Sequence, residues 1–313
     1  MDKHLVLLSG TAHPELSRKI AEYLGVAVAD MEVFKFANDN TFCKINVNIR
    51  QRDVYVIQPT SRPVNDNLME LLIILDACKR SSAKSITAVI PYYGYARSDK
   101  KDQPRVPITA KLVADLLTVA GAGRIITLDL HAEAIQGFFN IPVDHLYATP
   151  VFIEYLRRLE ADALVIVSPD AGGVARARAY AKRLEADLAI VDKRRVGNVD
   201  RAEVMHVIGE VENKLCVLVD DIIDTAGSIT RAAAAIKEQG AKEVRALATH
   251  GELSGPAVER LEKSVLSEVV DSDTIPVPPE KQFKKLKVLS IAPLLAETIK
   301  RIYSGDSVSS LFV

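Results

Sequence analysis

Short apolar runs recur at intervals along this chain, and they limit its possible folds more than any other feature. Runs in which every residue is apolar are typical of strands buried on both faces of a parallel sheet. Segments with helical periodicity lie between most of them. The runs are Leu5–Leu8, Val54–Ile57, Ile86–Ile90, Ile125–Leu128, Leu164–Val167, Leu188–Val191, Cys216–Val219 and Val244–Ala248, and the helical segments are Pro14–Leu24, Asn67–Lys79, Ile108–Ala120, Pro150–Leu159, Gly173–Leu184 and Ser228–Gln239.

This alternation predicts an α/β protein with mainly parallel sheets flanked by helices. The 313 residues suffice for two domains of ordinary size. We place the predicted boundary in the turn His145–Pro150, which gives domains over residues 1–147 and 148–313. The last helix, Pro293–Tyr303, is a candidate to pack back on the first domain. In sheets of this kind ligands bind at the carboxyl ends of the strands.

Composition excludes several classes of partner. The net charge is −1, so neither nucleic acid nor an anionic membrane is an expected partner, and phosphate recognition must depend on a few placed groups. Cys43, Cys78 and Cys216 are far apart and form no CxxC pair, which fits a reducing cytoplasm. No apolar stretch approaches the ~20 residues that span a bilayer, and the N-terminal apolar run is too short for a signal peptide.

The segment Lys214–Ser228, KLCVLVDDIIDTAGS, is the most specific signal in the chain. An apolar strand leads into two acids, then into small and hydroxyl residues, and then into an alanine-rich helix. Small residues allow a ligand to approach the backbone closely, and amides at a helix N-terminus bind anions. The loop Asp224-Thr225-Ala226-Gly227-Ser228 therefore predicts a site for a phosphate monoester.

Asp220 and Asp221 would repel that phosphate, so we expect them to accept hydrogen bonds from sugar hydroxyls beside it, directly or through a metal. The alternative is a strand end followed by a helix whose N-cap is Asp224 or Thr225. Other phosphate motifs are absent. The sequence contains no P-loop, and Gly121-Ala122-Gly123 lacks the third glycine of a dinucleotide fingerprint.

The Lys214–Ser228 segment resembles the phosphoribosyl-binding signature of phosphoribosyltransferases and ribose-phosphate pyrophosphokinases. Further segments resemble only the pyrophosphokinases, and this resemblance extends over essentially the full chain. It implies two similar domains of the phosphoribosyltransferase type, with the active site between domains and between subunits. The segments are Asn65–Leu71, Pro91–Ala114, Leu128–Phe139 and Val167–Ala175.

The resemblance implies transfer of the diphosphoryl group of Mg-ATP to the 1-hydroxyl of ribose 5-phosphate. It assigns the ribose 5-phosphate site to Arg195, Asp220, Asp221 and the loop Asp224–Ser228. Lys193 and Arg195 would stabilise the transferring group, because phosphoryl transfer needs positive charge on its equatorial oxygens. Without the resemblance, the run Asp192–Arg195 indicates only a solvated basic turn.

The remaining assignments concern ATP and Mg²⁺. The resemblance implies that Arg97 contacts ATP in a polar segment, residues 97–107, whose composition suits a mobile lid or a solvated loop. His131 and Asp170 match the family's metal-linked positions. Alone, His131 would more often be a structural histidine, and Asp170 would be a helix N-cap.

The chain departs from the family pattern on the ATP side. The adenine motif F-S-D/N-G-E is replaced by Phe36-Ala37-Asn38-Asp39-Asn40, and the Gln of Y-A-R-Q-D by Ser98. We still expect Phe36, Asn38, Asp39, Asn40 and Ser98 to lie at the ATP site.

Two other functions stay open from the sequence. One is a phosphoribosyltransferase, which needs a base-recognition hood and no lid. The other is a catalytically silent, synthetase-associated regulatory subunit, which should lose residues such as Lys193 or Arg195. The family also implies a homo-oligomer, commonly a hexamer.

Overall fold

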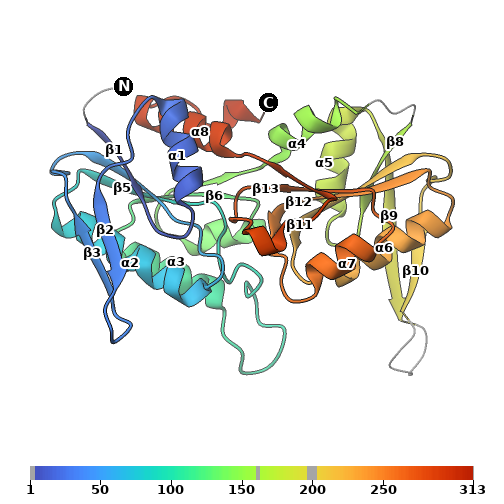
Figure 1. Ribbon diagram of the computed structural model, residues 1–313, viewed down its shortest axis with the longest axis horizontal. Coiled ribbons are helices and arrows are strands. Elements are labelled where there is room, and N and C mark those ends of the chain that lie inside the picture. The colour runs from blue at the N-terminus through green and yellow to red at the C-terminus, as the bar shows by residue number, and fades with distance from the viewer. Residues whose placement is uncertain (1–3, 160–162, 196–202, 313) are drawn as a thin grey trace. The chain divides into compact units, whose positions relative to one another are not determined.

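The chain divides into two compact units. The computed structural model describes residues 4–159, 163–195 and 203–312. One unit comprises Met1–Ala148, Thr274–Pro276 and Ser290–Val313, and the other comprises Thr149–Asp273 and Val277–Leu289. Each unit contains a mainly parallel sheet flanked by helices (Figure 1), which confirms the predicted fold class.

The first unit is built on a five-stranded parallel sheet with the strand order β1-β4-β5-β6-β7. Because all five strands are parallel, their carboxyl ends meet at one edge, from which the connecting loops leave. The strands are β1 (Leu5–Ser9), β4 (Asp53–Ile57), β5 (Ser85–Ile90), β6 (Arg124–Leu128) and β7 (Val143–Leu146).

Helices cover both faces of this sheet. The helices α2 (Val64–Arg80) and α3 (Thr109–Ala120) pack on one face and share a core with β4 and β5. On the other face, α1 (Pro14–Leu24) packs against α8 (Ala292–Ser304), which comes from the C-terminal end of the chain (Figure 1). The first unit is therefore completed by residues that follow the second unit in sequence.

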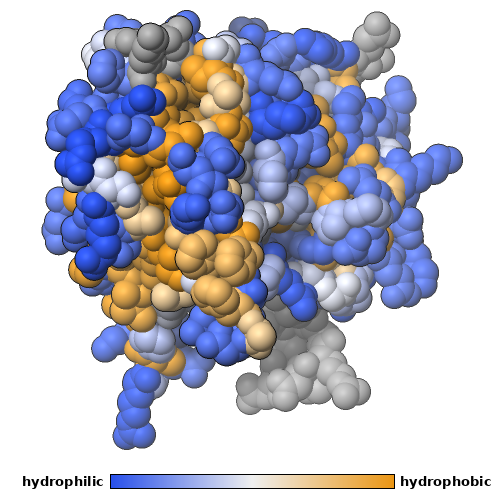
Figure 2. All heavy atoms as spheres, turned by 60° about the vertical axis from the view of Figure 1, so that its left-hand side comes forward, coloured by the Kyte–Doolittle hydropathy of each residue, from blue (hydrophilic) through white to orange (hydrophobic). Residues whose placement is uncertain are grey.

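A β-hairpin that the sequence did not predict extends from the first unit. It consists of β2 (Met31–Lys35) and β3 (Thr41–Ile45), paired antiparallel. Phe34 and Phe36 are exposed on it, and their rings lie against Phe42. Figure 2 shows apolar side chains gathered over this side of the molecule. The strands were missed because none of their residues is fully buried and both contain charged residues.

The second unit contains a seven-stranded sheet with the order β10-β9-β8-β11-β12-β13-β14, in which only β10 runs antiparallel. Thus β11, which carries the acids and the phosphate loop, lies beside β8 and one strand away from β9. The strands are β8 (Leu164–Ser168), β9 (Asp187–Arg195), β10 (Glu203–Ile208), β11 (Leu215–Ile223), β12 (Glu243–Gly251), β13 (Glu268–Ser272) and β14 (Leu286–Leu289).

Two pairs of helices flank the second sheet. The helix α6 (Gly227–Glu238) packs on β11 and β12 and contacts α7 (Ala257–Lys263). Its buried face includes Ala232 and Ala233, whose small side chains let the helix lie close to the strands. The helix α5 (Val174–Leu184) packs on β8 and β9 and contacts α4 (Thr149–Leu156).

Most predicted helices and strands are confirmed to within a few residues. One strand is longer than predicted and includes residues of the predicted site. The apolar run Leu188–Val191 continues as β9 through Arg195, so the interpretation of the basic cluster as a turn after the strand was wrong. The charged end stays extended because β10 pairs with it, with Lys193 opposite Met205 and Arg195 opposite Glu203. In the described ranges, no helix combines the length and apolar character needed to cross a membrane.

Candidate functional site

The connection from β11 to α6 is the predicted phosphate loop. Ala226 is the N-cap of α6 and has a left-handed backbone, with φ 60° and ψ 7°. Among the described residues no side chain caps the helix, so the amides of its first turn lack the partner that a Ser or Asp cap would supply. The alternative interpretation, a helix capped by Asp224 or Thr225, is therefore wrong.

The carbonyl groups of this loop accept hydrogen bonds from the segment that follows β12 and from α7. Leu253 and Ser254 donate their N–H groups to the carbonyls of Ile223 and Asp224, at 3.0 and 2.9 Å. The Nη1 atom of Arg260 donates to the carbonyl of Thr225 at 3.0 Å. In a trans peptide the C=O and N–H bonds point in opposite directions, so the amides of residues 224–226 face away from these partners. The loop thus presents successive N–H groups beside a helix N-terminus, an arrangement that binds anions.

Two arginines that the sequence analysis did not select flank Gly227. A Cβ atom built on Gly227 would lie 3.3 Å from Nη1 of Arg260 and 3.5 Å from Nη1 of Arg231. Arg231 lies one turn into α6 and reaches Gly227 by helix geometry, whereas Arg260 comes from α7 and reaches the loop because α7 packs on α6. Their charge adds to the anion preference of the loop amides.

The acids Asp220 and Asp221 lie at the end of β11, just before this loop. The pairing of β11 with β8 ends at Leu218, so both acids lie beyond the last paired residue on that side. The side chains of Asp220 and Asp221 are 24% and 7% exposed. Burial raises the pKa of Asp220 to about 8, the hydrogen bond and charge of Asp221 add to the rise, and Arg176 opposes it.

Three other predicted residues lie at the same edge of the second sheet. Asp170 follows β8, is exposed, and accepts a hydrogen bond from the amide of Gly173 at 2.9 Å. It therefore fixes the residue that precedes α5, but the N-cap of this helix is Gly173, so the interpretation of Asp170 as the N-cap was wrong. Lys193 and Arg195 occupy alternate positions at the end of β9, and their side chains lie outside the described part of the structure. Since β9, β8 and β11 are neighbours in the sheet, these segments leave it side by side.

In the first unit, His131 lies on an exposed loop after β6. Two hydrogen bonds from the β7 side fix this loop. Nε2 of His145 accepts the amide of Leu130 at 3.0 Å, and the Asp129 carboxylate accepts the amide of Ala148 at 2.9 Å. Asp129 has a φ of 36°, a left-handed value that Asp tolerates better than most residues. The backbone that carries His131 is thus held in a defined conformation.

Arg97 and Ser98 lie in the loop between β5 and α3, where Arg97 is exposed. Ser98 closes the base of this loop. Its carbonyl accepts the amide of Ala110 at 3.1 Å, and its hydroxyl lies 3.2 Å from that of Thr109. Residues 99–105 beyond it are mostly exposed and irregular. The serine that replaces the family's glutamine therefore has a structural role in the loop.

The segment Phe36–Asn40 forms the turn of the β2–β3 hairpin. Phe36 exchanges backbone contacts across it, donating to the carbonyl of Asn40 at 2.9 Å and accepting from Asp39 at 2.8 Å. Asp39 has a φ of 67°, so this position requires the left-handed conformation in which glycine is favoured. Asp is among the residues that adopt it at low cost. The departure from the family's glycine therefore preserves the turn.

The side chains present fit a Mg²⁺ ion that is bound mostly by substrate. Among the described residues there is no group of three or more His, Cys, Asp or Glu side chains that could hold a metal ion. Mg²⁺ usually keeps several waters and is bound by one or two protein groups together with substrate phosphates. The exposed side chains of His131 and Asp170 are of the types that can supply such a contact, and their assignment to the metal stays a prediction.

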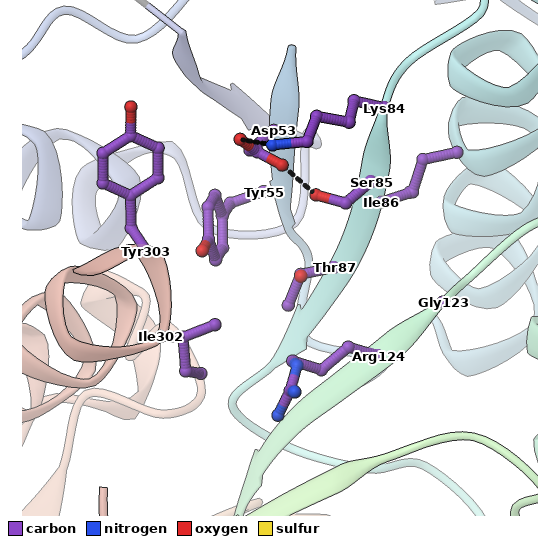
Figure 3. A pocket seen from close by; sticks show the side chains of 10 residues that line it. All are labelled: Asp53, Tyr55, Lys84, Ser85, Ile86, Thr87, Gly123, Arg124, Ile302 and Tyr303. Atoms are coloured by element: carbon purple, nitrogen blue, oxygen red, sulfur yellow. Dashed lines mark hydrogen bonds and ion pairs between the residues drawn. The ribbon is translucent and has the colours of Figure 1, made fainter. Parts of the chain in front are cut away.

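One pocket of about 450 Å³ lies elsewhere in the first unit (Figure 3). It is lined by residues at the amino ends of β4, β5 and β6, the edge opposite to the predicted ATP side. Its charges are paired: Asp53 accepts from Lys84 and Ser85 at 3.4 and 2.6 Å, and Arg124 lies 2.6 Å from Asp144. Because Lys84 and Arg124 are each paired with a carboxylate, the pocket offers little net positive charge to bind a phosphate ligand.

Two family models match the chain. Residues 5–121 match the N-terminal domain of ribose phosphate pyrophosphokinase, and residues 193–313 match the phosphoribosyl synthetase-associated domain.

Full-length relatives give a consistent result. A ribose-phosphate pyrophosphokinase of Gloeobacter violaceus is 53% identical over 99% of this chain and 94% of its own length. One of Caldanaerobacter subterraneus is 55% identical over 98% of both chains. The crystal structure of phosphoribosylpyrophosphate synthetase from Mycobacterium smegmatis has a TM-score of 0.92 and 46% identity, and the match covers 97% of this chain and 100% of that one.

Proposed function

This chain belongs to the ribose-phosphate pyrophosphokinase family, and we propose that its second unit binds ribose 5-phosphate and its first unit binds Mg-ATP. It is a ribose-phosphate diphosphokinase, which forms 5-phosphoribosyl 1-diphosphate and AMP. The observation that carries the ribose 5-phosphate assignment is the β11–α6 loop, with its left-handed Ala226 and uncapped helix start.

In the proposed complex, the amides of Asp224–Ser228 and the hydroxyls of Thr225 and Ser228 bind the 5-phosphate. Asp220 and Asp221 then accept hydrogen bonds from the ribose hydroxyls. Both acids lie near the end of β11, and the phosphate loop follows this strand directly. Anion donors beside carboxylate acceptors match the two ends of a phosphorylated pentose. This spacing favours ribose 5-phosphate over a ligand that carries phosphate alone.

On the ATP side, Phe36 would stack on adenine while Asn38, Asp39 and Asn40 lie along its edge in the hairpin turn. Arg97 and the loop based on Ser98 would contact the phosphates. His131 and Asp170 would hold Mg²⁺, which supplies positive charge to the phosphate oxygens when it is bound.

The transfer itself needs positioning and charge. The 1-hydroxyl oxygen of ribose 5-phosphate forms a bond to the β-phosphorus of ATP, the bond from that phosphorus to the oxygen of the α-phosphate breaks, and AMP leaves. The hydroxyl proton passes to solvent. Lys193 and Arg195 would neutralise the charge on the transferring group, the largest contribution in reactions of this kind.

Release of AMP tests this function directly. The protein is incubated with ATP, ribose 5-phosphate and Mg²⁺, and AMP and the pyrophosphate product are quantified. We expect AMP only when all three are present. Product without ribose 5-phosphate, or none with the complete mixture, would contradict the proposal, and the latter would favour a silent regulatory subunit. Replacing ATP by other nucleoside triphosphates shows whether the Asn38–Asn40 turn changes donor preference.

A substitution at Ala226 tests the phosphate loop. Ala226→Val places a β-branched side chain at a left-handed position, where alanine is tolerated but β-branched residues are outliers, so we expect the loop to shift. Because 1.4 kcal/mol is a factor of 10 in affinity, we expect the KM for ribose 5-phosphate to rise about tenfold. Ala226→Gly, which fits the same φ of 60°, is the matched control and should leave KM unchanged. Equal KM values for both variants would remove the loop from the site.

Oligomeric state and location complete the proposal. We expect a homo-oligomer, a hexamer by family resemblance, whose formation can be measured by light scattering. We also expect the protein to act in the cytoplasm, where its free cysteines Cys43, Cys78 and Cys216 would stay reduced.

A further inference from the structure

Arg176 occupies an unusual position for a cation. It is the third residue of α5, in the first turn of the helix, and this turn contains no acidic residue. The N-terminus of a helix carries a partial positive charge, so a cation there is disfavoured. Its side chain is also only 23% exposed. A partly buried arginine at this place needs anions from another element to offset both costs.

The anions are the two acids of β11. A single nitrogen of Arg176, Nη1, lies 3.4 Å from Oδ1 of Asp220 and 3.2 Å from Oδ1 of Asp221. The amide of Asp221 donates to the same Oδ1 of Asp220 at 2.9 Å. One carboxylate oxygen of Asp220 is therefore held from two directions, and Asp221 is held by the same cation.

The fold explains why this cation reaches both acids. The ladder between β8 and β11 stops at the pair Val167 and Leu218, so in the described part of the sheet β8 has no residue paired with the acids. The chain leaves β8 at Ser168 and starts α5 at Val174, which places the first turn of α5 beside the open end of β11. Arg176 thus fills the position that a longer β8 would have occupied.

We propose that Arg176 is a positioning residue for ribose 5-phosphate, which orients Asp220 and Asp221 so that their remaining oxygens accept the sugar hydroxyls. This inference rests on the proposed function. The shared cation holds the two neighbouring acids in one arrangement, and without it their side chains would separate. That change would move the hydroxyl acceptors away from the sugar. Arg176 acts through the acids, so no contact of its own with substrate is required.

Three variants test the inference. Arg176→Gln removes the charge, Arg176→Lys keeps a charge but not the planar fork, and Arg178→Gln removes an exposed arginine of the same helix. Loss of a charged hydrogen bond typically reduces affinity about tenfold or more. We expect that rise in the KM for ribose 5-phosphate with Arg176→Gln, a smaller one with Arg176→Lys, and none with Arg178→Gln. The KM for ATP should stay unchanged in all three.

A double-mutant cycle separates positioning from a general structural role. If Arg176 acts through the acids, adding Arg176→Gln to Asp221→Asn should raise the KM for ribose 5-phosphate much less than it does alone. Full additivity, or an equal rise in the KM for ATP, would overturn the inference. If Arg176→Gln does not fold, Arg176→Lys decides: a KM equal to that of Arg178→Gln overturns it.

The wild-type protein separates this inference from the function on which it rests. If the wild type releases AMP and Arg176→Gln has the wild-type KM for ribose 5-phosphate, the positioning role is wrong and the function stands. If the wild type releases no AMP, the proposed function fails first. Calorimetric titration of each variant with ribose 5-phosphate gives the affinities without turnover.

Discussion

Replacing Lys193 by alanine is expected to lower kcat by about 10²- to 10³-fold, the effect of removing one group that stabilises developing charge. Arg195→Ala should reduce kcat similarly and also raise the KM for ribose 5-phosphate, because Arg195 is assigned to both roles. Both residues lie at the end of β9, which is separated from β11 and its acids by the single strand β8. Steady-state kinetics with each substrate varied in turn measure both effects.

Arg194 supplies the matched control, since it lies between the two and carries the same charge. Arg194→Ala should retain kcat within about threefold, because Arg194 is assigned no substrate contact and substitutions away from such contacts usually change free energies by no more than ~0.5 kcal/mol. If all three substitutions reduced kcat alike, the net charge of the segment would be responsible and the individual assignments would be wrong. Thermal melting of each variant verifies folding.

Asp271→Asn is expected to stabilise the protein by about 1–3 kcal/mol at pH 8, because the neutral amide avoids the cost of ionising a buried carboxyl group. Asp271 on β13 is 1% exposed, its Oδ1 accepts the amide of Ser272 at 2.8 Å, and its Oδ2 has no hydrogen-bond partner in the part of the chain that the structure describes. Burial raises the pKa of Asp271 well above the ordinary carboxyl range, and nearby amides offset only part of this.

The pH dependence identifies the cause. Because the folded-state pKa is raised, the protonated acid is favoured by folding, and stability falls as the pH rises above the pKa of the unfolded chain. The asparagine variant lacks this loss, so its advantage should be largest at pH 8 and nearly absent near pH 4. Glu262→Gln, an exposed change on α7 in the same unit, should alter stability little at either pH. Urea unfolding at both values measures the difference, and an advantage that does not vary with pH would contradict the explanation.

The sequence predicts the parts of the fold in which local pattern and burial agree. The run Cys216–Val219 is recognisable because a strand covered on both faces is apolar at every position. The start of α6 is recognisable from its alanine-rich composition. The hairpin strands and the end of β9 are not, because partly exposed or charged residues there are held extended by their pairing partners. Tertiary context overrides propensity at such edges.

The residues of the site also differ in whether the sequence alone could identify them. The loop Asp224–Ser228 is visible in sequence because its small residues are contiguous. Arg176 and Arg260 are not, since each meets the site across a gap of more than thirty residues in the chain, from Arg176 to Asp220 and from Arg260 to Thr225. No local pattern distinguishes them from other helical arginines. A cation in the first turn of a predicted helix was the one signal that could have suggested Arg176.

The return of the C-terminal helix α8 to the first unit affects how the protein must be made. During translation, the first 148 residues leave the ribosome long before Ala292–Ser304 exists. Until then the face of α1 that contacts α8 is not covered by that helix. This condition lasts for nearly half of the synthesis. A fragment that ends near residue 148 would lack α8 permanently, and this face of α1 would stay uncovered. The native state of the N-terminal half is therefore a property of the whole polypeptide.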